Sequence, residues 1–217
     1  MDKITTVIGN GYQQPPEFTR DFFKDSEGLF FIDIGANDGE TWSNTLFLEK
    51  SLNWKGICIE PHPTMFKKLI TTRCVECINV AVSDKEGIAD FLCIEGSWEA
   101  NMLSGLVDKY GQQHKERVDK EYVRFGGVST NIQVPTIPLQ SILDVRNISK
   151  VDYLSIDTEG AELSILQSLD FSKVDITLIS VETNYGGDEF DKILNSYGYN
   201  FVTKVACDSF YTKKIYD

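Results

Sequence analysis

The chain has 217 residues, enough for one domain, and its 41% hydrophobic and 25% charged residues are typical of a folded globular protein. Its 33 acidic and 21 basic residues give a formal net charge of -12, which argues against binding to nucleic acid or to an anionic membrane surface. The longest apolar runs are too short to span a bilayer, and residues 1–6 lack the apolar stretch of a signal peptide.

The cysteines favour a reducing compartment, so we expect a cytoplasmic protein. Their number, five, is odd, and Cys58 and Cys93 lie in apolar runs where a free thiol behaves as a small hydrophobe. Cys74 and Cys77 have the C-x-x-C spacing of some redox and zinc sites. The sequence has no second such pair and only two histidines, so we expect neither role.

The hydrophobic pattern of the first half predicts alternating strands and helices after a polar lead-in at residues 1–28. Compact apolar runs bounded by turn residues indicate buried parallel strands, and apolar residues three or four apart indicate helices. In chain order we expect a short helix at 18–24, a strand at 29–34, a helix at 41–52, a strand at 56–59, a helix at 63–70 and a strand at 77–82.

The second half interrupts this alternation and then resumes it. Residues 88–94 fit a strand, whereas residues 95–131 are polar, contain five glycines and exceed the length of an ordinary connection. We interpret 95–131 as an inserted, irregular, lid-like segment that moves and gates access of an acceptor. After it we expect a helix at 139–145, a strand at 153–156, a helix at 162–169, a strand at 176–181, a helix at 190–197, and a closing antiparallel hairpin of strands at 199–206 and 209–213.

Repeated strand–helix units predict a single α/β domain over residues 1–217, a Rossmann-like three-layer sandwich with a mostly parallel sheet. In such sheets the ligand lies beyond the carboxyl ends of the strands. Acidic residues stand at four of these ends: Asp33, Glu60, Asp157 and Glu182.

The glycine turn at residues 33–39 is the first candidate ligand site. Gly35 allows a tight turn and a close backbone approach, but neither the G-x-G-x-x-G fingerprint nor a Walker A motif is present. Asp33 and Asp38 flank the turn, which suits a ligand with ammonium and hydroxyl groups better than one with phosphates. A simple strand–helix turn is the alternative. Glu60, at the end of the next strand, is placed to accept two ribose hydroxyls.

Together these features resemble the FkbM-type family of class I S-adenosylmethionine-dependent methyltransferases. The matching stretches are FIDIGANDG at 31–39, IEP at 59–61, NVAVSD at 79–84, VPTIPL at 134–139 and LSIDTEGAE at 154–162. The resemblance covers roughly residues 29–205. It implies a seven-stranded sheet in the order 3-2-1-4-5-7-6, with the donor bound over the first three strands.

The resemblance also implies roles for individual residues. The methionine part of the donor would be wrapped by Asp33, Gly35, Ala36, Asn37 and Gly39. Glu60, followed by Pro61, would hold the ribose. Ala81, Val82 and Ser83 would lie near the adenine, and Ser104 is a candidate substrate contact in the inserted segment.

The acceptor side centres on Asp157 and Glu182, which should face the methyl-transfer centre. A hydroxyl acceptor must lose a proton, so a carboxylate, a histidine or a metal is expected there. Asp157 is either this base or a group that binds backbone or donor. Asp157, Glu182 and Asn184 also resemble the Mg²⁺ ligands of catechol-type O-methyltransferases, which leaves a metal site as an alternative.

Two candidates remain. His62 follows Glu60 at a helix start, where it is either a catalytic residue or a helix cap. Glu159 is a candidate substrate contact. His114 in the inserted segment should be solvated. The leading hypothesis is O-methylation of a sugar or another small-molecule hydroxyl; the preference for a glycan comes from the family and not from these residues. The alternatives are a nicotinamide-dependent oxidoreductase and a catalytically silent donor-binding module. The oligomeric state is left open.

Overall fold

The protein was analysed as a computed structural model that describes residues 14–184 and 188–214, without the side chains of 14–16. Part of the expected lead-in, residues 1–13, lies outside the described residues. Seven strands form the central sheet, in the order β10-β11-β9-β8-β1-β2-β3. Their bounds are β1 (Phe30–Ile34), β2 (Lys55–Ile59), β3 (Glu76–Ile78), β8 (Lys150–Ile156), β9 (Asp175–Glu182), β10 (Asn200–Val205) and β11 (Asp208–Thr212).

This sheet confirms the expected order 3-2-1-4-5-7-6 and is mixed. The five neighbouring strands β3, β2, β1, β8 and β9 run parallel to one another. Strand β11 pairs antiparallel with both β9 and β10. The hairpin explains the reversal, because the short turn between β10 and β11 can join only antiparallel neighbours.

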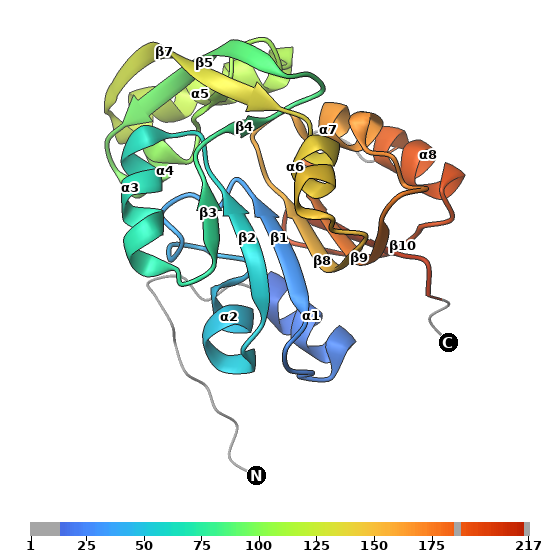
Figure 1. Ribbon diagram of the computed structural model, residues 1–217. Helices are drawn as coiled ribbons and strands as arrows, with labels where there is room; N and C mark the ends of the chain where they lie inside the picture. Colours follow the sequence, from blue (N-terminus) through green and yellow to red (C-terminus); the bar gives the residue numbers. More distant parts are fainter. Residues whose placement is uncertain (1–13, 185–187, 215–217) are drawn as a thin grey trace.

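Two groups of helices cover the two faces of the sheet, which confirms the three layers (Figure 1). On one face α1 (Gln14–Phe23), α2 (Leu46–Leu52) and α3 (Pro63–Thr72) pack on Phe31, Cys58 and Tyr153. On the other face α6 (Leu139–Arg146), α7 (Glu162–Ser168) and α8 (Asp188–Ser196) pack on Ile32 and Ile57. Neighbouring residues of β1 and of β2 therefore enter different cores, as the two-residue period of a strand requires.

A second, four-stranded sheet was not predicted. It has the order β4-β7-β5-β6, formed by β4 (Ala81–Val82), β7 (Val128–Ile137), β5 (Gly87–Glu95) and β6 (Gly105–Leu106). In Figure 1 this sheet lies above the upper ends of β1 and β2. The expected strand at 77–82 is wrong as one element, because β3 ends at Ile78 and β4 belongs to the second sheet.

The segment 95–131 is folded, so its expected irregularity is wrong. It contains α4 (Trp98–Asn101), β6, α5 (Gln112–Phe125) and the first residues of β7. Ala100, Leu103, Tyr110 and Val118 form a small core with Ile94. These few apolar side chains are enough to order a segment whose average composition is polar. Movement of the segment stays a prediction.

The helix expected at 41–52 begins only at Leu46. Residues 41–45 form a turn instead, in which Trp42 has a φ of 56°. The Ser43 hydroxyl accepts hydrogen bonds from the backbone N–H groups of Thr45 and Leu46, so a side chain satisfies the first N–H group of α2.

Among the described residues, no helix is both long and apolar enough to cross a membrane.

Candidate active site

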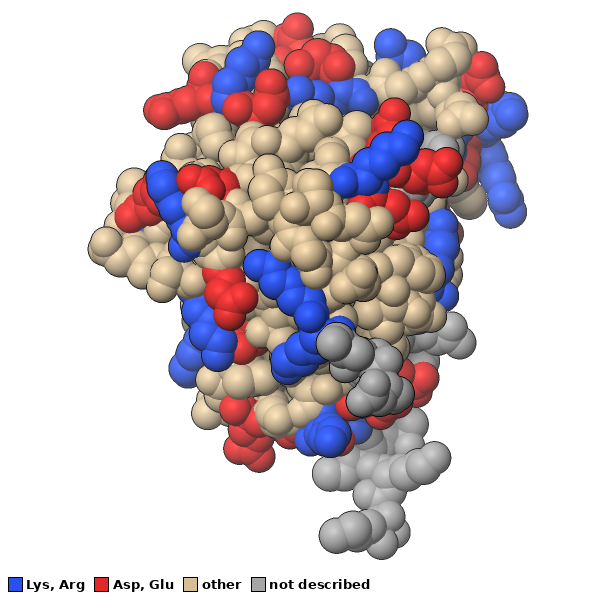
Figure 2. All heavy atoms as spheres, turned by 90° about the vertical axis from the view of Figure 1, so that its right-hand side faces the viewer, with Lys and Arg blue, Asp and Glu red and all other residues tan. Residues whose placement is uncertain are grey.

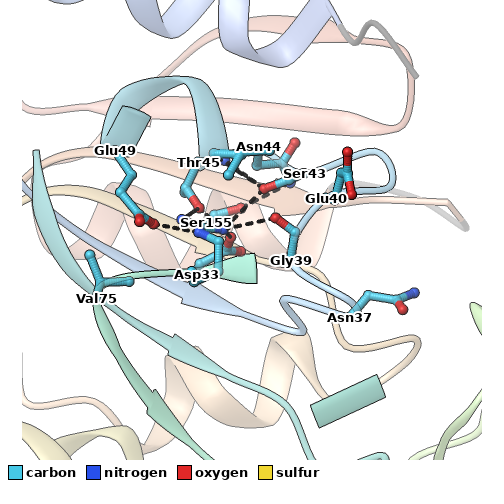
Figure 3. Close-up of polar contacts among 12 residues, drawn as sticks. Asp33, Asn37, Gly39, Glu40, Ser43, Asn44, Thr45, Glu49, Val75 and Ser155 are labelled. Atoms are coloured by element: carbon cyan, nitrogen blue, oxygen red, sulfur yellow. Dashed lines mark hydrogen bonds and ion pairs between the residues drawn. The ribbon is translucent and has the colours of Figure 1, made fainter. Parts of the chain in front are cut away.

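A buried polar network fixes the turn after β1 (Figure 3). Asp33 is 3% exposed, accepts a hydrogen bond from the Thr45 hydroxyl at 2.5 Å and lies 3.9 Å from the guanidinium of Arg73. Arg73 also donates to Glu49 at 2.5 Å. Burial raises the pKa of Asp33, and Arg73 and Thr45 oppose that change. This network holds residues 41–45 against the end of β1.

Gly35 is required where the turn crosses the end of β8. A Cβ built on Gly35, whose φ is +88°, would lie 1.6 Å from the carbonyl oxygen of Asp157. The two loops are therefore in backbone contact. Gly39 allows a different close approach, because a Cβ there would meet Leu69 and Arg73 at 2.7 and 2.8 Å. Gly39 packs on α3 and does not reach the pocket described below.

Glu60 joins the ends of β1 and β2. Its carboxylate accepts hydrogen bonds from the backbone N–H of Asn37 at 2.8 Å and of His62 at 2.7 Å. Burial raises the pKa of Glu60 to about 7, although both hydrogen bonds favour the charged form. Burial therefore opposes the charged form that the two backbone N–H groups favour.

A pocket opens at the carboxyl ends of β1, β2 and β8, between the central sheet and the second sheet, and encloses about 920 Å³ with its open mouth. The carboxylates of Asp33, Glu60, Asp157 and Glu159 line it, and within the described part of the chain no lysine or arginine does. Of the predicted site residues it also gathers Gly35, Ala36, Asn37, Pro61, His62, Ala81, Val82 and Ser104.

Four predicted site residues lie outside this lining: Gly39, Ser83, Glu182 and Asn184. Ser83 is buried, and its hydroxyl bonds to Asp84. The walls include residues that sequence reasoning missed, namely Thr41, Trp42, Ser43, Asn44, Met65, Phe91, Asn101, Met102 and Leu106. The polar run 41–45 gave a usable signal, because such residues favour turns over helix interiors. Asn101, Met102 and Leu106 lie in the stretch from which the family resemblance singled out only Ser104.

Asp157, Glu159 and Glu182 form a carboxylate cluster, in which one oxygen from each lies within 4.8 Å of the others. Burial, and then the charge of Glu182, raises the pKa of both Asp157 and Glu159. Burial and the charge of Glu162 raise the pKa of Glu182 to about 7. Like charges this close oppose one another's ionisation, so each carboxyl of the cluster holds its proton more tightly than an isolated one.

The predicted metal ligands are only partly brought together. Asn184 turns its amide nitrogen toward Glu182, donating a hydrogen bond of 2.6 Å, and Glu159 takes the third position in the cluster. Glu159 has a φ of 58° and accepts a hydrogen bond from Arg117 at 2.9 Å. Three carboxylates are nonetheless a donor set of the kind that hard cations such as Mg²⁺ take.

A second cavity of about 1300 Å³, counted with its open mouth, adjoins the cluster. Glu182 and Asn184 line it, together with Lys109, His114 and Glu162. Glu159 lines both cavities, so this side chain stands between them. Glu162 is occupied at the start of α7, where it accepts hydrogen bonds from the N–H groups of Thr158 and Gly160.

The two histidines are both buried. His62 caps α3, where its Nδ1 accepts from the N–H of Thr64 at 3.2 Å and its Nε2 lies 3.2 Å from the carbonyl oxygen of Ile94. Burial lowers the pKa of His62, and this geometry favours capping over proton transfer. His114 was expected to be solvated, which is wrong: it is 2% exposed, against the Tyr110 ring and 3.3 Å from Glu159, because it lies on the inner face of α5.

Comparison with known proteins supplies the family. Residues 33–201 match the methyltransferase FkbM domain. Among solved structures, methyltransferase FkbM from Methylobacillus flagellatus is 13% identical with a TM-score of 0.49, covering 87% of this chain and 44% of that chain. A methyltransferase from Pyrococcus furiosus is 13% identical with a TM-score of 0.41, covering 92% and 83%. A SAM-dependent methyltransferase from Aquifex aeolicus is 15% identical with a TM-score of 0.37, covering 91% and 87%. No curated protein matches.

The α/β fold, with its mixed seven-stranded sheet, is that of a class I methyltransferase. The chain belongs to the methyltransferase FkbM domain family, since the match covers more than half of its residues. Membership of this family implies S-adenosylmethionine as the methyl donor. The chain spans less than half the length of the Methylobacillus flagellatus protein that it matches.

Proposed function

We propose that this protein binds S-adenosylmethionine in the pocket at the ends of β1, β2 and β8 and transfers its methyl group to a hydroxyl of a sugar or another small molecule. The acidity of the pocket carries this proposal: four carboxylates line it, without a lysine or arginine among the described residues. The donor carries a sulfonium and an ammonium group against a single carboxylate and has no phosphate, so its net positive charge complements such a lining.

Each part of the donor has a chemically suited wall. The turn at Gly35 and Asn37 lines the side of the pocket proposed for the methionine part, and Glu60 lies at the strand end where a ribose would be held. Ala81 and Val82 supply an apolar surface for the adenine. Because both oxygens of Glu60 already accept backbone N–H groups, ribose hydroxyls would share those oxygens and favour the charged form.

The carboxylate cluster supplies the chemistry for a hydroxyl acceptor. Asp157 lines the donor pocket, and its carboxylate lies within 4.8 Å of those of Glu159 and Glu182, so we assign to it the role of the base that takes the proton of the attacking hydroxyl. Burial and the charge of Glu182 raise the pKa of Asp157, which makes its carboxylate a stronger base than an exposed aspartate. The acceptor enters from the second cavity, past Glu159, and positioning against the methyl group supplies much of the rate.

A bound Mg²⁺ is the alternative use of the same cluster. Asp157, Glu159 and Glu182 would hold the ion, and it would acidify the acceptor hydroxyl. The carboxylates fit a hard cation chemically, and the present arrangement also fits proton sharing. Removal of divalent cations by chelation separates the two.

The small-molecule acceptor is supported by charge. The formal net charge is -12, and on the face in Figure 2 the lysine and arginine side chains are scattered among acidic ones. A long anionic partner such as nucleic acid would meet repulsion. The glycan preference rests on the family alone.

Donor identity is the decisive experiment. Isothermal titration with S-adenosylhomocysteine, S-adenosylmethionine and NAD should give micromolar-range binding for the first two and none for NAD. NAD carries a pyrophosphate, for which the acidic lining is unsuited, so binding of NAD alone would favour the oxidoreductase. Donor binding without methyl transfer to a broad panel of sugars and small hydroxyl compounds would favour a silent module.

A further inference from the structure

The carboxylate cluster has a positively charged neighbour that comes from the inserted segment. Arg117 lies on α5, and its Nη1 donates a hydrogen bond to Oε2 of Glu159 at 2.9 Å. The same oxygen lies 3.3 Å from Nδ1 of His114. Among the described residues, Arg117 is the only lysine or arginine that forms an ion pair with a member of the cluster. The inserted segment therefore contacts the cluster itself.

The fold holds α5 against the cluster at two points. Arg117 and Val118 follow His114 by three and four residues, so the three share one face of the helix, on which His114 and Val118 are buried. A Cβ built on Gly160, whose φ is +125°, would lie 2.9 Å from the carbonyl oxygen of Lys109, so the loop after β8 touches the chain just before α5. The place of Arg117 beside the cluster is therefore set by the packing of the helix.

Three carboxylates this close call for a cation, and Arg117 supplies one. Their oxygens lie within 4.8 Å of one another, and buried charges in proteins are paired or coordinate a metal. Lys109 lines the second cavity but pairs with Asp84. An arginine side chain keeps its charge at every pH at which a protein is folded. A metal ion that entered the cluster would share the Glu159 carboxylate with the guanidinium of Arg117 and would be repelled by it.

We propose that Arg117 supplies the positive charge of the carboxylate cluster in place of a metal ion. Arg117 is then a positioning residue, which holds Glu159 beside Asp157, while Asp157 itself acts on the acceptor. The inference rests on the proposed function, in which the cluster serves the acceptor hydroxyl. It selects the metal-free use of the cluster over the alternative with Mg²⁺.

The test measures how tightly the cluster takes a divalent cation once the charge of Arg117 is removed. Mn²⁺ is the probe, and electron paramagnetic resonance reports the free ion during a titration of the protein without a methyl donor. Arg117→Met keeps the length of the side chain but not its charge, so it should bind Mn²⁺ roughly 10- to 100-fold more tightly than wild type. Arg117→Lys keeps a positive charge near Glu159 and should bind Mn²⁺ as weakly as wild type.

Two controls separate the cluster from a general effect of charge. Arg124→Met removes the same charge from the exposed last turn of α5, where Arg124 lies over the ring of Phe125, and should leave Mn²⁺ binding at the wild-type level. Adding Glu159→Gln to Arg117→Met should abolish the gain in affinity, because an amide then replaces one of the three carboxylates. Arg117→Gln takes the place of Arg117→Met if circular dichroism shows that the latter is unfolded.

The inference is overturned if wild type and Arg117→Met bind Mn²⁺ equally, whether tightly or weakly. It is also overturned if Arg117→Lys or Arg124→Met gains as much as Arg117→Met, or if the gain survives Glu159→Gln. A wild-type protein that binds no S-adenosylhomocysteine refutes the proposed function instead, so the two failures are distinguishable.

Discussion

Replacing Glu182 with glutamine should make the fold more stable at alkaline pH. Glu182 ends β9 within 4.8 Å of Asp157 and Glu159, measured between their nearest carboxylate oxygens. Burial and the charge of Glu162 raise its pKa from 4.5 to about 7. The native protein therefore holds more protons than the unfolded chain between these two pH values, so its stability falls as the pH rises through this window.

The size of the effect follows from the same two values. The step from 4.5 to about 7 corresponds to about 3 kcal/mol of destabilisation above pH 7, which is absent below pH 4.5. Glutamine cannot ionise and keeps an oxygen for the amide of Asn184. Glu182→Gln should then recover up to about 3 kcal/mol at pH 8, or roughly 6–12 °C in Tm for a chain of this length.

Thermal unfolding followed by circular dichroism at pH 5, 6, 7 and 8 measures the effect. The Tm difference between Glu182→Gln and wild type should grow with pH and be small at pH 5. Glu86→Gln is the control, since Glu86 is exposed in the turn before β5 and should give a constant difference. A Glu182→Gln protein whose Tm gain is the same at pH 5 and pH 8, or negative at both, would refute the reasoning.

Three further outcomes are expected. Gly35→Ala should cost more than about 3 kcal/mol of stability, measured by urea unfolding, because its Cβ would lie 1.6 Å from a carbonyl oxygen at a φ of +88°; an ordinary stability would show that the two loops are not in contact. Asp157→Asn should abolish methyl transfer and leave the affinity for S-adenosylhomocysteine within about threefold by calorimetry, and EDTA should silence the wild type only if the cluster holds a metal. Donor binding should change tryptophan fluorescence, because Trp42 lines the pocket. Trp42→Phe should lose this signal. Trp54→Phe, which replaces a tryptophan buried in the core, should keep it.

The inner strands of the central sheet were predictable because they are largely apolar on both faces. Runs such as residues 30–34 and 153–156 are buried almost throughout, so they stand out from the helices on either side. The order of the strands followed from the family resemblance, since periodicity alone does not say which strands are neighbours. The rule that ligands bind at the carboxyl ends then brought Asp33, Glu60 and Asp157 to one pocket.

The second sheet could not be predicted in the same way. Its longest pairing joins β5 to β7, from Gly87 opposite Thr136 to Glu95 opposite Val128, across the whole inserted segment. Much of β7 is exposed, so its residues carry little hydrophobic signal. The pocket wall that contains Asn101, Met102 and Leu106 depends on this long-range pairing.

The backbone itself marks the pocket independently of any family. Eight non-glycine residues have a positive φ among those described. Four follow helix ends, where a left-handed residue is common, and Ala206 lies in the β10–β11 turn. The other three, Asn37, Trp42 and Glu159, all line the donor pocket. A left-handed backbone conformation costs free energy for side chains of this size. Three such residues lie together at one edge of the sheet, beside carboxylates of raised pKa. This edge is therefore organised for a ligand at the expense of stability.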